Sequence, residues 1–255
     1  MPTPFLLLQL SDTHIGADWG EGDPVSDLEA AIASVRRLPD PPDAVLVSGD
    51  VANGGEDGQY ARAYELLDRL PGPVYVMAGN HDDREQLRRH FSLPGSGGEP
   101  IQYAVDLDAA RLVVVDTTRP GADDGELDEE RLAWLQDALS EAPDRLTVLA
   151  LHHPPLITGI EPWDATALSA DHRRALLDVL DRHPQVKLLV AGHVHRMIVT
   201  RFGGRPLITV PSTHLQAKLQ FGPSQLELTA EPPAYVLHSV VDGEVVSHLQ
   251  PVALG

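Results

Sequence analysis

The chain has 255 residues, no cysteine and a formal net charge of -19. The lack of cysteine excludes disulfide bonds and thiolate metal sites, and the acidic balance argues against nucleic-acid polymers and anionic membranes as partners. Because no segment approaches the length of a membrane span and hydrophobic residues make up 42% of the chain, we expect a globular protein, and the lack of cysteine fits a cytoplasmic location.

Strands and helices alternate along the first part of the chain. Apolar runs at Phe5–Leu10, Ala44–Val47 and 74–78 are short and continuous, which is typical of buried parallel strands. The first run is expected to be a strand and not a signal peptide, since no basic residues precede it and no small-residue cleavage site follows it. Apolar residues at helical spacing predict helices over 28–38 and 60–70, and a third helix is expected at about 82–91.

The later part of the chain changes from alternating elements to hairpins. Strands are predicted at 101–107, 112–116, 146–151 and Val186–Ala191. Helices are predicted through Leu132, Leu135 and Leu139 and through Leu168, Leu176 and Leu180, with Trp163 in a loop before the second of them. Turn residues predict two hairpins, which pair 194–201 with 206–210 and 235–241 with 244–249.

One domain is expected over residues 1–255, of the α/β class and with antiparallel strands completing a βαβ body. Residues 213–233 have weak periodicity and are predicted to form a loop or cap. This segment could cover a pocket or form a contact between copies of the chain, so a homodimer or higher homo-oligomer stays open.

Five predicted strands are followed directly by side chains that bind metal ions. These side chains are Asp12 and His14, Asp50, Asn80 and His81, His152 and His153, and His193 and His195. Taken singly, each is explained as a helix cap, a turn residue or a surface histidine. Parallel strands, however, end at one edge of a sheet, where ligands gather. Buried carboxylates without basic neighbours are costly there, so the combination indicates bound cations.

The number of these side chains indicates two metal ions and not one. About seven ligands exceed what a tetrahedral zinc needs, and they match two ions about 3.5–4 Å apart that share a carboxylate. The imidazole-rich set favours divalent transition-metal ions such as Fe, Mn, Zn or Co over Mg or Ca.

These motifs, in this order, resemble the signature of the calcineurin-like metallophosphoesterase superfamily. The resemblance covers about residues 6–249 and is carried by Asp12-x-His14, Gly49-Asp50, Gly79-Asn80-His81-Asp82, His152 and Gly192-His193-x-His195. Within the superfamily, the class III cyclic nucleotide phosphodiesterase and glycerophosphodiesterase branch is the most similar. That similarity is carried by Ser11-Asp12-Thr13-His14, Gly79-Asn80-His81-Asp82-Asp83, His152-His153-Pro154-Pro155 and Asp116-Thr117-Thr118-Arg119.

The resemblance implies a four-layer α/β/β/α sandwich with mixed sheets and a dinuclear metal centre. One metal is then expected to take Asp12, His14 and His195, and the other Asn80, His152 and His193. Asp50 is expected to bridge them. His81 is expected to meet the substrate phosphate without binding metal, and either to protonate the leaving oxygen or to hydrogen-bond the phosphate.

Several further residues have two explanations each. Asp82 is a candidate catalytic residue that orients His81, or an ordinary carboxylate at a helix N-terminus. His153 is favoured as a packing or supporting histidine. Asn53, Arg119 and His214 are candidate substrate contacts, although a loop Asn and a surface Arg are simpler explanations for the first two. Trp163 could stack on a base or anchor its loop.

The resulting hypothesis is a metal-dependent phosphodiesterase that hydrolyses a small diester, such as 3',5'-cAMP or a glycerophosphodiester. Hydroxide that bridges the metals is expected to attack phosphorus in line with the leaving alkoxide. A phosphomonoesterase or protein phosphatase with the same centre is the main alternative. A non-catalytic metal-binding module is the second alternative, which a missing bridging Asp or an altered His81 would have favoured.

Overall fold

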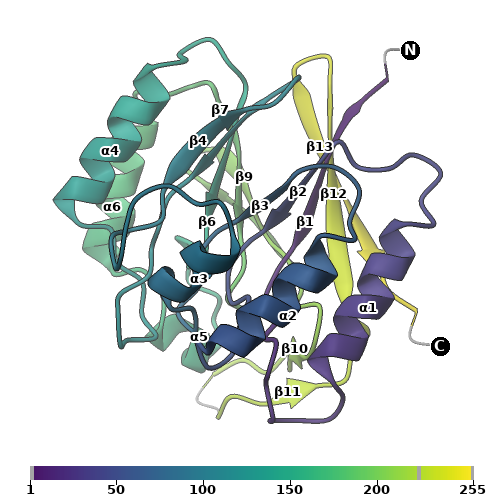
Figure 1. The fold of residues 1–255 in the computed structure, drawn as a ribbon. Helices are drawn as coiled ribbons and strands as arrows, with labels where there is room; N and C mark the ends of the chain where they lie inside the picture. Colours follow the sequence, from purple (N-terminus) through teal and green to yellow (C-terminus); the bar gives the residue numbers. More distant parts are fainter. Residues whose placement is uncertain (1–2, 223–224, 254–255) are drawn as a thin grey trace.

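A computed structural model describes residues 3–222 and 225–253, and two mixed β-sheets form its centre (Figure 1). In the first sheet, three parallel strands adjoin an antiparallel hairpin in the order β13-β12-β1-β2-β3. The parallel strands are β1 (Phe5–Leu10), β2 (Ala44–Val47) and β3 (Val74–Val76). The hairpin consists of β12 (Ala234–Val241) and β13 (Glu244–Pro251).

The second sheet has the order β4-β5-β6-β7-β9-β8. Its four inner strands are parallel, and its two edge strands are antiparallel to their neighbours. The strands are β4 (Tyr103–Asp106), β5 (Arg111–Val114), β6 (Thr147–Leu151), β7 (Val186–Ala191), β8 (Ile198–Phe202) and β9 (Arg205–Thr209).

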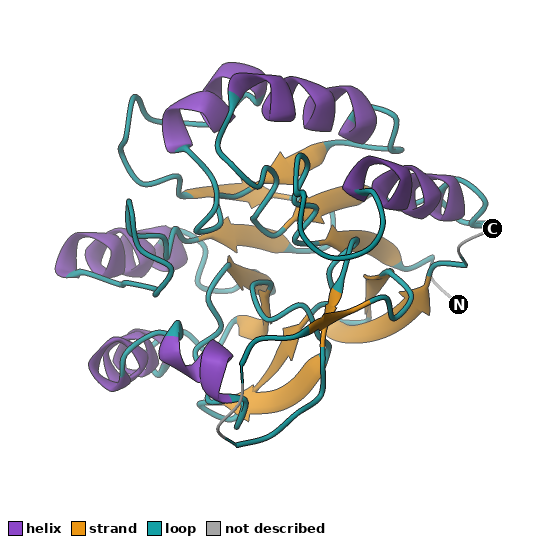
Figure 2. Cartoon of the chain, turned by 90° about the horizontal axis from the view of Figure 1, so that it is seen from below, coloured by secondary structure: helices purple, strands orange, loops and turns teal. Residues whose placement is uncertain are grey.

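Helices cover the outer faces of both sheets (Figure 2). The first sheet is covered by α1 (Pro24–Val35), α2 (Asp57–Leu67) and α3 (Arg84–His90), and the second by α4 (Glu129–Ser140) and α6 (Ala170–Leu180). Each of these two interfaces has its own apolar core, and a third core, which includes Leu46 and Val190, fills the space between the sheets. Three cores between four layers confirm the predicted α/β/β/α arrangement.

Three smaller elements lie at the end of the molecule where the parallel strands finish (Figure 1). They are α5 (Glu161–Ala165) and the short antiparallel pair of β10 (Gln216–Ala217) and β11 (Leu228–Thr229). The pair lies inside the 213–233 segment, of which residues 223–224 fall outside the described residues. A role for this segment as a cap or a dimer contact stays a prediction, as does the single domain.

Some predicted boundaries are wrong. Trp163 lies in α5 and not in a loop, and Leu168 precedes α6, whose N-cap is Ser169. The strand predicted from Val194 begins only at Ile198, because His195 has a left-handed backbone with φ 46° that an extended strand does not accept. The strands predicted at 74–78, 101–107 and 112–116 are each shorter than expected. Among the residues that the structure describes, no helix combines the length and apolar character needed to cross a membrane.

A buried polar chain crosses the apolar layer between the sheets beneath the strand ends. The Gln9 side chain donates to Ser48 Oγ at 2.8 Å and to the Ala191 carbonyl at 3.4 Å, so it links the two sheets. His238 Nε2 donates to Gln9 Oε1 at 3.0 Å, and the Ser247 hydroxyl donates to His238 Nδ1 at 2.7 Å. The imidazole is therefore fully paired in its neutral form.

His238→Gln should reduce the loss of stability in acid. Burial lowers the pKa of His238 to about 3, well below the ordinary value of about 6.5. As the pH falls below 6.5, the unfolded chain binds a proton that the folded chain does not, so this ring favours unfolding. Between pH 7 and pH 5 the wild type should lose about 2 kcal/mol more free energy of unfolding than the variant, as measured by urea denaturation. Equal losses in both proteins would contradict this expectation, and His248→Gln, at an exposed neighbour, serves as the control.

Candidate metal centre

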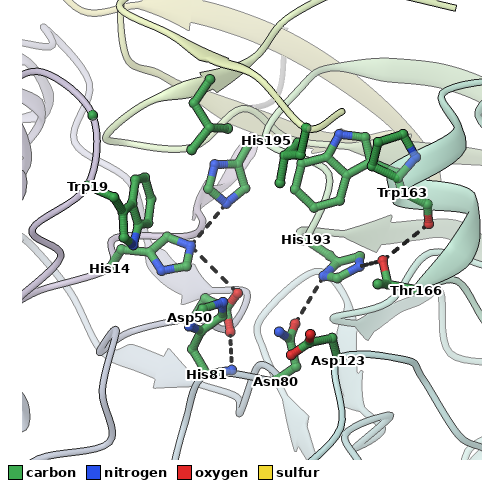
Figure 3. A pocket seen from close by; sticks show the side chains of 14 residues that line it. His14, Trp19, Asp50, Asn80, His81, Asp123, Trp163, Thr166, His193 and His195 are labelled. Carbon is green, nitrogen blue, oxygen red and sulfur yellow. Dashed lines mark hydrogen bonds and ion pairs between the residues drawn. The ribbon is translucent and has the colours of Figure 1, made fainter. Parts of the chain in front are cut away.

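The predicted ligands converge at the carboxyl edge of the two sheets, around the floor of a pocket of about 500 Å³. Figure 3 labels the five that line the pocket, which are His14, Asp50, Asn80, His193 and His195. Six of the seven predicted ligands are almost completely buried, and Asn80 is partly buried. Strands β1, β2 and β3 lead to Asp12 and His14, to Asp50 and to Asn80, whereas β6 and β7 lead to His152, His193 and His195. The ligands therefore come from both sheets.

The first cluster contains Asp12, His14 and His195. The Nε2 atoms of His14 and His195 lie 3.0 Å apart. Asp12 Oδ1 lies 3.7 Å from His195 Nε2, and Asp50 Oδ2 lies 3.6 Å from His14 Nε2. One ion could contact all of these atoms.

The second cluster contains Asn80, His152 and His193. Asn80 Oδ1 lies 3.1 Å from His152 Nε2 and 3.0 Å from His193 Nδ1. Asp50 Oδ2 lies 3.4 Å from His152 Nε2, so the same oxygen that approaches the first cluster also approaches the second. This position is the one that a bridging carboxylate needs.

Hydrogen bonds on the far side of three imidazoles direct their lone pairs toward the centre. His152 Nδ1 donates to the Ser48 carbonyl at 2.9 Å, and His195 Nδ1 donates to the Leu215 carbonyl at 2.8 Å. His14 Nδ1 donates to Asn53 Oδ1 at 3.2 Å. Since Nδ1 carries the hydrogen in each neutral ring, Nε2 presents a lone pair. Lone pairs 3.0 Å apart repel unless a cation lies between them, so the donor set fits two transition-metal ions.

The ionisation of these groups depends on their burial and on one another. Burial raises the pKa of Asp12 and lowers the pKa values of His14 and His193 well below the usual range. Although burial opposes its charge, the imidazoles of His152 and His14 hold the pKa of Asp50 well below the usual range. Burial likewise opposes the charge of His152, but the attraction of Asp50 raises its pKa to about 9. Asp50 thus stabilises positive charge at the position where the two clusters meet.

The backbone at the strand ends is strained at the ligands. Asp12, His14, Asp50, His193 and His195 have φ between 44° and 70°. Among the described residues, the only other non-glycine residue with positive φ is Asp242, in the β12–β13 turn. Such conformations cost of order 1 kcal/mol or more each, and they persist where the surroundings impose them. Each of these residues turns its side chain toward the pocket floor instead of continuing a strand.

Gly79 and Gly192 allow neighbouring strand ends to approach closely. A Cβ at Gly79 would lie 2.3 Å from the Asp50 backbone nitrogen, and a Cβ at Gly192 would lie 2.8 Å from the Ser48 carbonyl oxygen. No other residue type fits at either position without moving the backbone of the next strand.

His81, Asp82 and His153 occupy three different environments. His81 is exposed and lines the pocket, and its Nδ1 donates to the Asn53 carbonyl at 3.0 Å. Asp82 does not approach the His81 imidazole within hydrogen-bond distance, because its carboxylate accepts from the backbone of Val51, Ala52 and Gly79 and from the Tyr60 hydroxyl. Burial, with Asp50 nearby, raises the pKa of Asp82 to about 6.

The N-cap of α3 is Asp83 and not Asp82. His153 is held at both nitrogens, by Thr117 Oγ1 at 2.9 Å and the Asp123 carbonyl at 3.0 Å, and burial lowers its pKa to about 3. Neither arrangement tests a catalytic role directly, so the roles of Asp82 and His153 stay predictions.

The three candidate substrate contacts lie at different distances from the pocket. Asn53 Oδ1 accepts from Trp19 Nε1 at 3.0 Å and from His14, which links the pocket wall to a ligand. Arg119 pairs with Asp124 and borders an adjacent hollow that shares Asn80 and His81 with the pocket. His214 is buried outside the pocket lining, where its Nδ1 lies 2.7 Å from Asp27 Oδ2. Their substrate roles stay predictions.

Sequence reasoning named Trp163 as a possible stacking residue but missed four other residues of the pocket wall, Trp19, Thr166, Leu226 and Leu228. Trp19 and Trp163 lie on opposite sides of the pocket in Figure 3, with ring centroids 6.4 and 5.6 Å from that of His195. Thr166 Oγ1 lies 2.8 Å from His193 Nε2, and Leu226 and Leu228 come from the 213–233 segment. None of these residues is part of a motif. Trp19, Trp163 and Thr166 follow ligand-bearing strands, and Leu226 and Leu228 lie in the predicted cap segment, which are the only signals that could have indicated them.

Comparisons with known proteins agree with this geometry. Residues 5–197 match the family model of the calcineurin-like phosphoesterases. The chain is 32% identical over 256 residues to the glycerophosphodiester phosphodiesterase GpdQ of Enterobacter lignolyticus (strain SCF1). This alignment covers 97% of this chain and 91% of that protein. It is 32% identical over 230 residues to the 3',5'-cyclic adenosine monophosphate phosphodiesterase CpdA of Pseudomonas aeruginosa. That alignment covers 89% of this chain and 81% of CpdA.

The fold also matches a solved structure. The purple acid phosphatase PPD1 of yellow lupin (Lupinus luteus) superposes with a TM-score of 0.71 at 13% identity. The superposition covers 99% of this chain and 52% of the phosphatase chain. At this identity the match concerns the fold alone. Together with the family match and the two relatives, it confirms the resemblance seen in the motifs: the chain belongs to the calcineurin-like metallophosphoesterase family.

Proposed function

We propose that this protein hydrolyses a small phosphodiester with two divalent transition-metal ions, drawn from Fe, Mn, Zn and Co. One observation carries the proposal: Asp50 Oδ2 lies within 3.6 Å of an imidazole nitrogen in each of two ligand clusters. The names of GpdQ and CpdA, both phosphodiesterases, support a diester as the substrate. A cyclic nucleotide such as 3',5'-cAMP and a glycerophosphodiester both fall within this proposal, and a cytoplasmic location stays a prediction.

In this proposal Asp12, His14 and His195 hold one ion, Asn80, His152 and His193 hold the other, and Asp50 is shared. When bound, such ions supply an activated water and screen charge on the phosphoryl oxygens. His81 acts from the side of the pocket. Its Nδ1 is fixed by the Asn53 carbonyl, so its Nε2 is the atom that exchanges a proton with the leaving oxygen or hydrogen-bonds the phosphate.

The charge of the pocket favours a diester over a monoester. In the described part of the chain, the pocket lining contains no Lys or Arg, and Asp123 adds a carboxylate beyond the ligands. Two divalent ions opposed by the carboxylates of Asp12, Asp50 and Asp123 leave one positive charge before the attacking hydroxide is counted and none after it, so the pocket accepts the monoanion of a diester more readily than a dianion. The dianion of a monoester is bound less readily, which disfavours the phosphatase alternative. The metal-binding module without catalysis is disfavoured because Asp50 and His81 are both in place.

The pocket walls favour a substrate arm with a flat or apolar surface. Trp19, Trp163, Leu226 and Leu228 surround the space above the ligands, and the volume of about 500 Å³ is in the range of small-molecule sites. Stacking of a base on an aromatic side chain contributes about 1–3 kcal/mol. Asp123 and Thr166 stand among these walls as partners for hydroxyl groups.

The metal-loaded protein should hydrolyse an aryl phosphodiester faster than the matching monoester. The reason is the low net positive charge of the pocket, which opposes a dianion more than a monoanion. Initial rates with bis(p-nitrophenyl) phosphate and p-nitrophenyl phosphate, each with Mn²⁺, measure the preference. A dominant monoester reaction would move the protein to the phosphatase alternative.

Asp50→Asn should lower kcat by at least about 100-fold, since the shared carboxylate holds both ions in register. Asp242→Asn is the matched control, because Asp242 also has a left-handed backbone, with φ 51°, but lies in the β12–β13 turn. Asn tolerates this conformation at both positions. The assignment of Asp50 fails if both variants keep wild-type rates.

Removal of metal should destabilise the fold. Without cations, the paired lone pairs and buried carboxylates repel one another. Each ion at 100 times its Kd adds about 2.7 kcal/mol to the free energy of unfolding. Thermal melts should therefore show a lower Tm after chelation with EDTA and recovery when Mn²⁺ is returned. A Tm that does not change with Mn²⁺ would argue against ion binding at this centre.

A further inference from the structure

Each ion site combines ligands from both sheets. In the first site, Asp12 and His14 follow β1, whereas His195 follows β7. In the second site, Asn80 follows β3, whereas His152 and His193 follow β6 and β7. The distances between ligands therefore depend on how firmly the sheets are joined at this edge.

The first site has its own connection between the sheets. The Ser212 hydroxyl donates to the Asp12 carbonyl at 2.7 Å. Three residues on, the Leu215 carbonyl accepts from His195 Nδ1 at 2.8 Å, and the Ala217 amide donates to the His195 carbonyl at 3.0 Å. Residues 212–217 thus hold Asp12 and His195 together.

A different connection lies next to the second site. Arg84 follows Asn80 by four residues and begins α3, and its side chain is only 7% exposed. It reaches across to the segment after β5, where its Nε donates to Asp116 Oδ2 at 2.9 Å and its Nη2 donates to the Thr118 carbonyl at 2.9 Å. The Asp116 side chain is completely buried. A buried, multiply bonded Arg–carboxylate pair of this kind has a fixed geometry.

The segment that binds Arg84 also supports the imidazoles of the second site. Between Asp116 and Thr118, the hydroxyl of Thr117 accepts from the His153 amide at 3.1 Å and lies 2.9 Å from His153 Nδ1. The His153 ring then packs against His193 and His152, at centroid distances of 4.5 and 5.0 Å. Residues 116–118 therefore contact Arg84, which lies four residues after Asn80. Through His153, the same residues also support the rings of His152 and His193.

We propose that Arg84 and Asp116 are positioning residues for the second ion site, which set the distance between Asn80 Oδ1 and the nitrogens of His152 and His193. Neither residue belongs to the lining of the pocket above the ligands, although Arg84 borders the adjacent hollow. This inference rests on the two-ion centre of the proposed function but not on the reaction. It gives a role to the Asp116-Thr117-Thr118 segment, which has no part in the proposed reaction.

The test compares two buried arginines that bond to the same carbonyl. Arg84→Lys keeps the charge but loses the fork that spans Asp116 and Thr118. Arg131→Lys is the matched control, because Arg131 is 4% exposed and also donates to the Thr118 carbonyl, at 3.1 Å. Its ionic partners, Glu126 and Asp128, lie in the same half of the molecule, so it does not join the sheets.

Mn²⁺ is titrated into each metal-free protein and followed by calorimetry and by EPR. We expect two ions in the wild type and in Arg131→Lys. In Arg84→Lys one ion should bind with unchanged affinity and the other about 10- to 100-fold more weakly, with loss of the spin-coupled Mn–Mn signal. Asp116→Asn, which keeps the shape of the carboxylate, should act in the same direction. Urea unfolding of the metal-free variants establishes that each is folded.

Double variants locate the effect. In an Asn80→Ala background, Arg84→Lys should not weaken Mn²⁺ binding any further, because it acts through Asn80. In an Asp12→Asn background, it should weaken Mn²⁺ binding by the same factor as in the wild type. Equal weakening of both ions, an equal effect of Arg131→Lys, or additivity with Asn80→Ala would each overturn the proposal. A wild type that binds two ions but hydrolyses no diester would overturn the proposed function instead, and would leave this inference intact.

Discussion

Two buried carboxylates and four buried imidazoles face one another at the carboxyl edge of the sheets, and in the described residues no Lys or Arg pairs with either carboxylate. Burial without compensation on this scale would cost several kcal/mol per charge. Arg84, a buried arginine four residues after Asn80, is already neutralised by Asp116. His152, whose pKa Asp50 raises to about 9, supplies only part of the positive charge that this edge requires. Cations from outside the chain would supply the rest, and the surrounding structure is arranged to receive them.

The backbone carries part of the energetic cost of that arrangement. Five ligands adopt left-handed conformations, and the amide groups near them are used to hold the strand ends in place. The His193 amide donates to the Asp12 carboxylate at 3.1 Å, and the His81 amide donates to Asp50 Oδ1 at 2.9 Å. The His14 amide likewise donates to the Asp50 carbonyl at 2.9 Å, so four of the five strained residues are bonded to a ligand from another strand, and the strain is imposed by several strands together. Burial of the apolar layers on both sides of the sheets offsets it.

Much of this centre could be predicted from the sequence, because its ligands follow strands that are short, apolar and easy to recognise. Asp12, Asp50 and His152 lie where their motifs placed them. What could not be predicted depends on contacts between distant segments. Asp82 follows His81 in the sequence, and this position does not indicate that its carboxylate accepts hydrogen bonds from the backbone amides that follow Asp50. The spacing of apolar residues also placed Leu168 inside helix α6, because periodicity alone does not show that Ser169 caps the helix.

The walls of the pocket have a different origin from its floor. Trp19, Pro162, Leu226 and Leu228 belong to loops, to the short helix α5 and to the β10–β11 pair, whereas the ligands end the strands of the sheets. Residues 212–217 are constrained by their bonds to Asp12 and His195. In the part of the chain that the structure describes, Leu228 is tied to this segment only by its pairing with Ala217, and Leu226 precedes that pair. Selection can therefore replace the walls while the hydrolytic floor is kept. After gene duplication, copies of such a chain could diverge in substrate while they keep the same chemistry, because a change of length in the 218–233 stretch would reshape the walls without moving a strand that bears ligands.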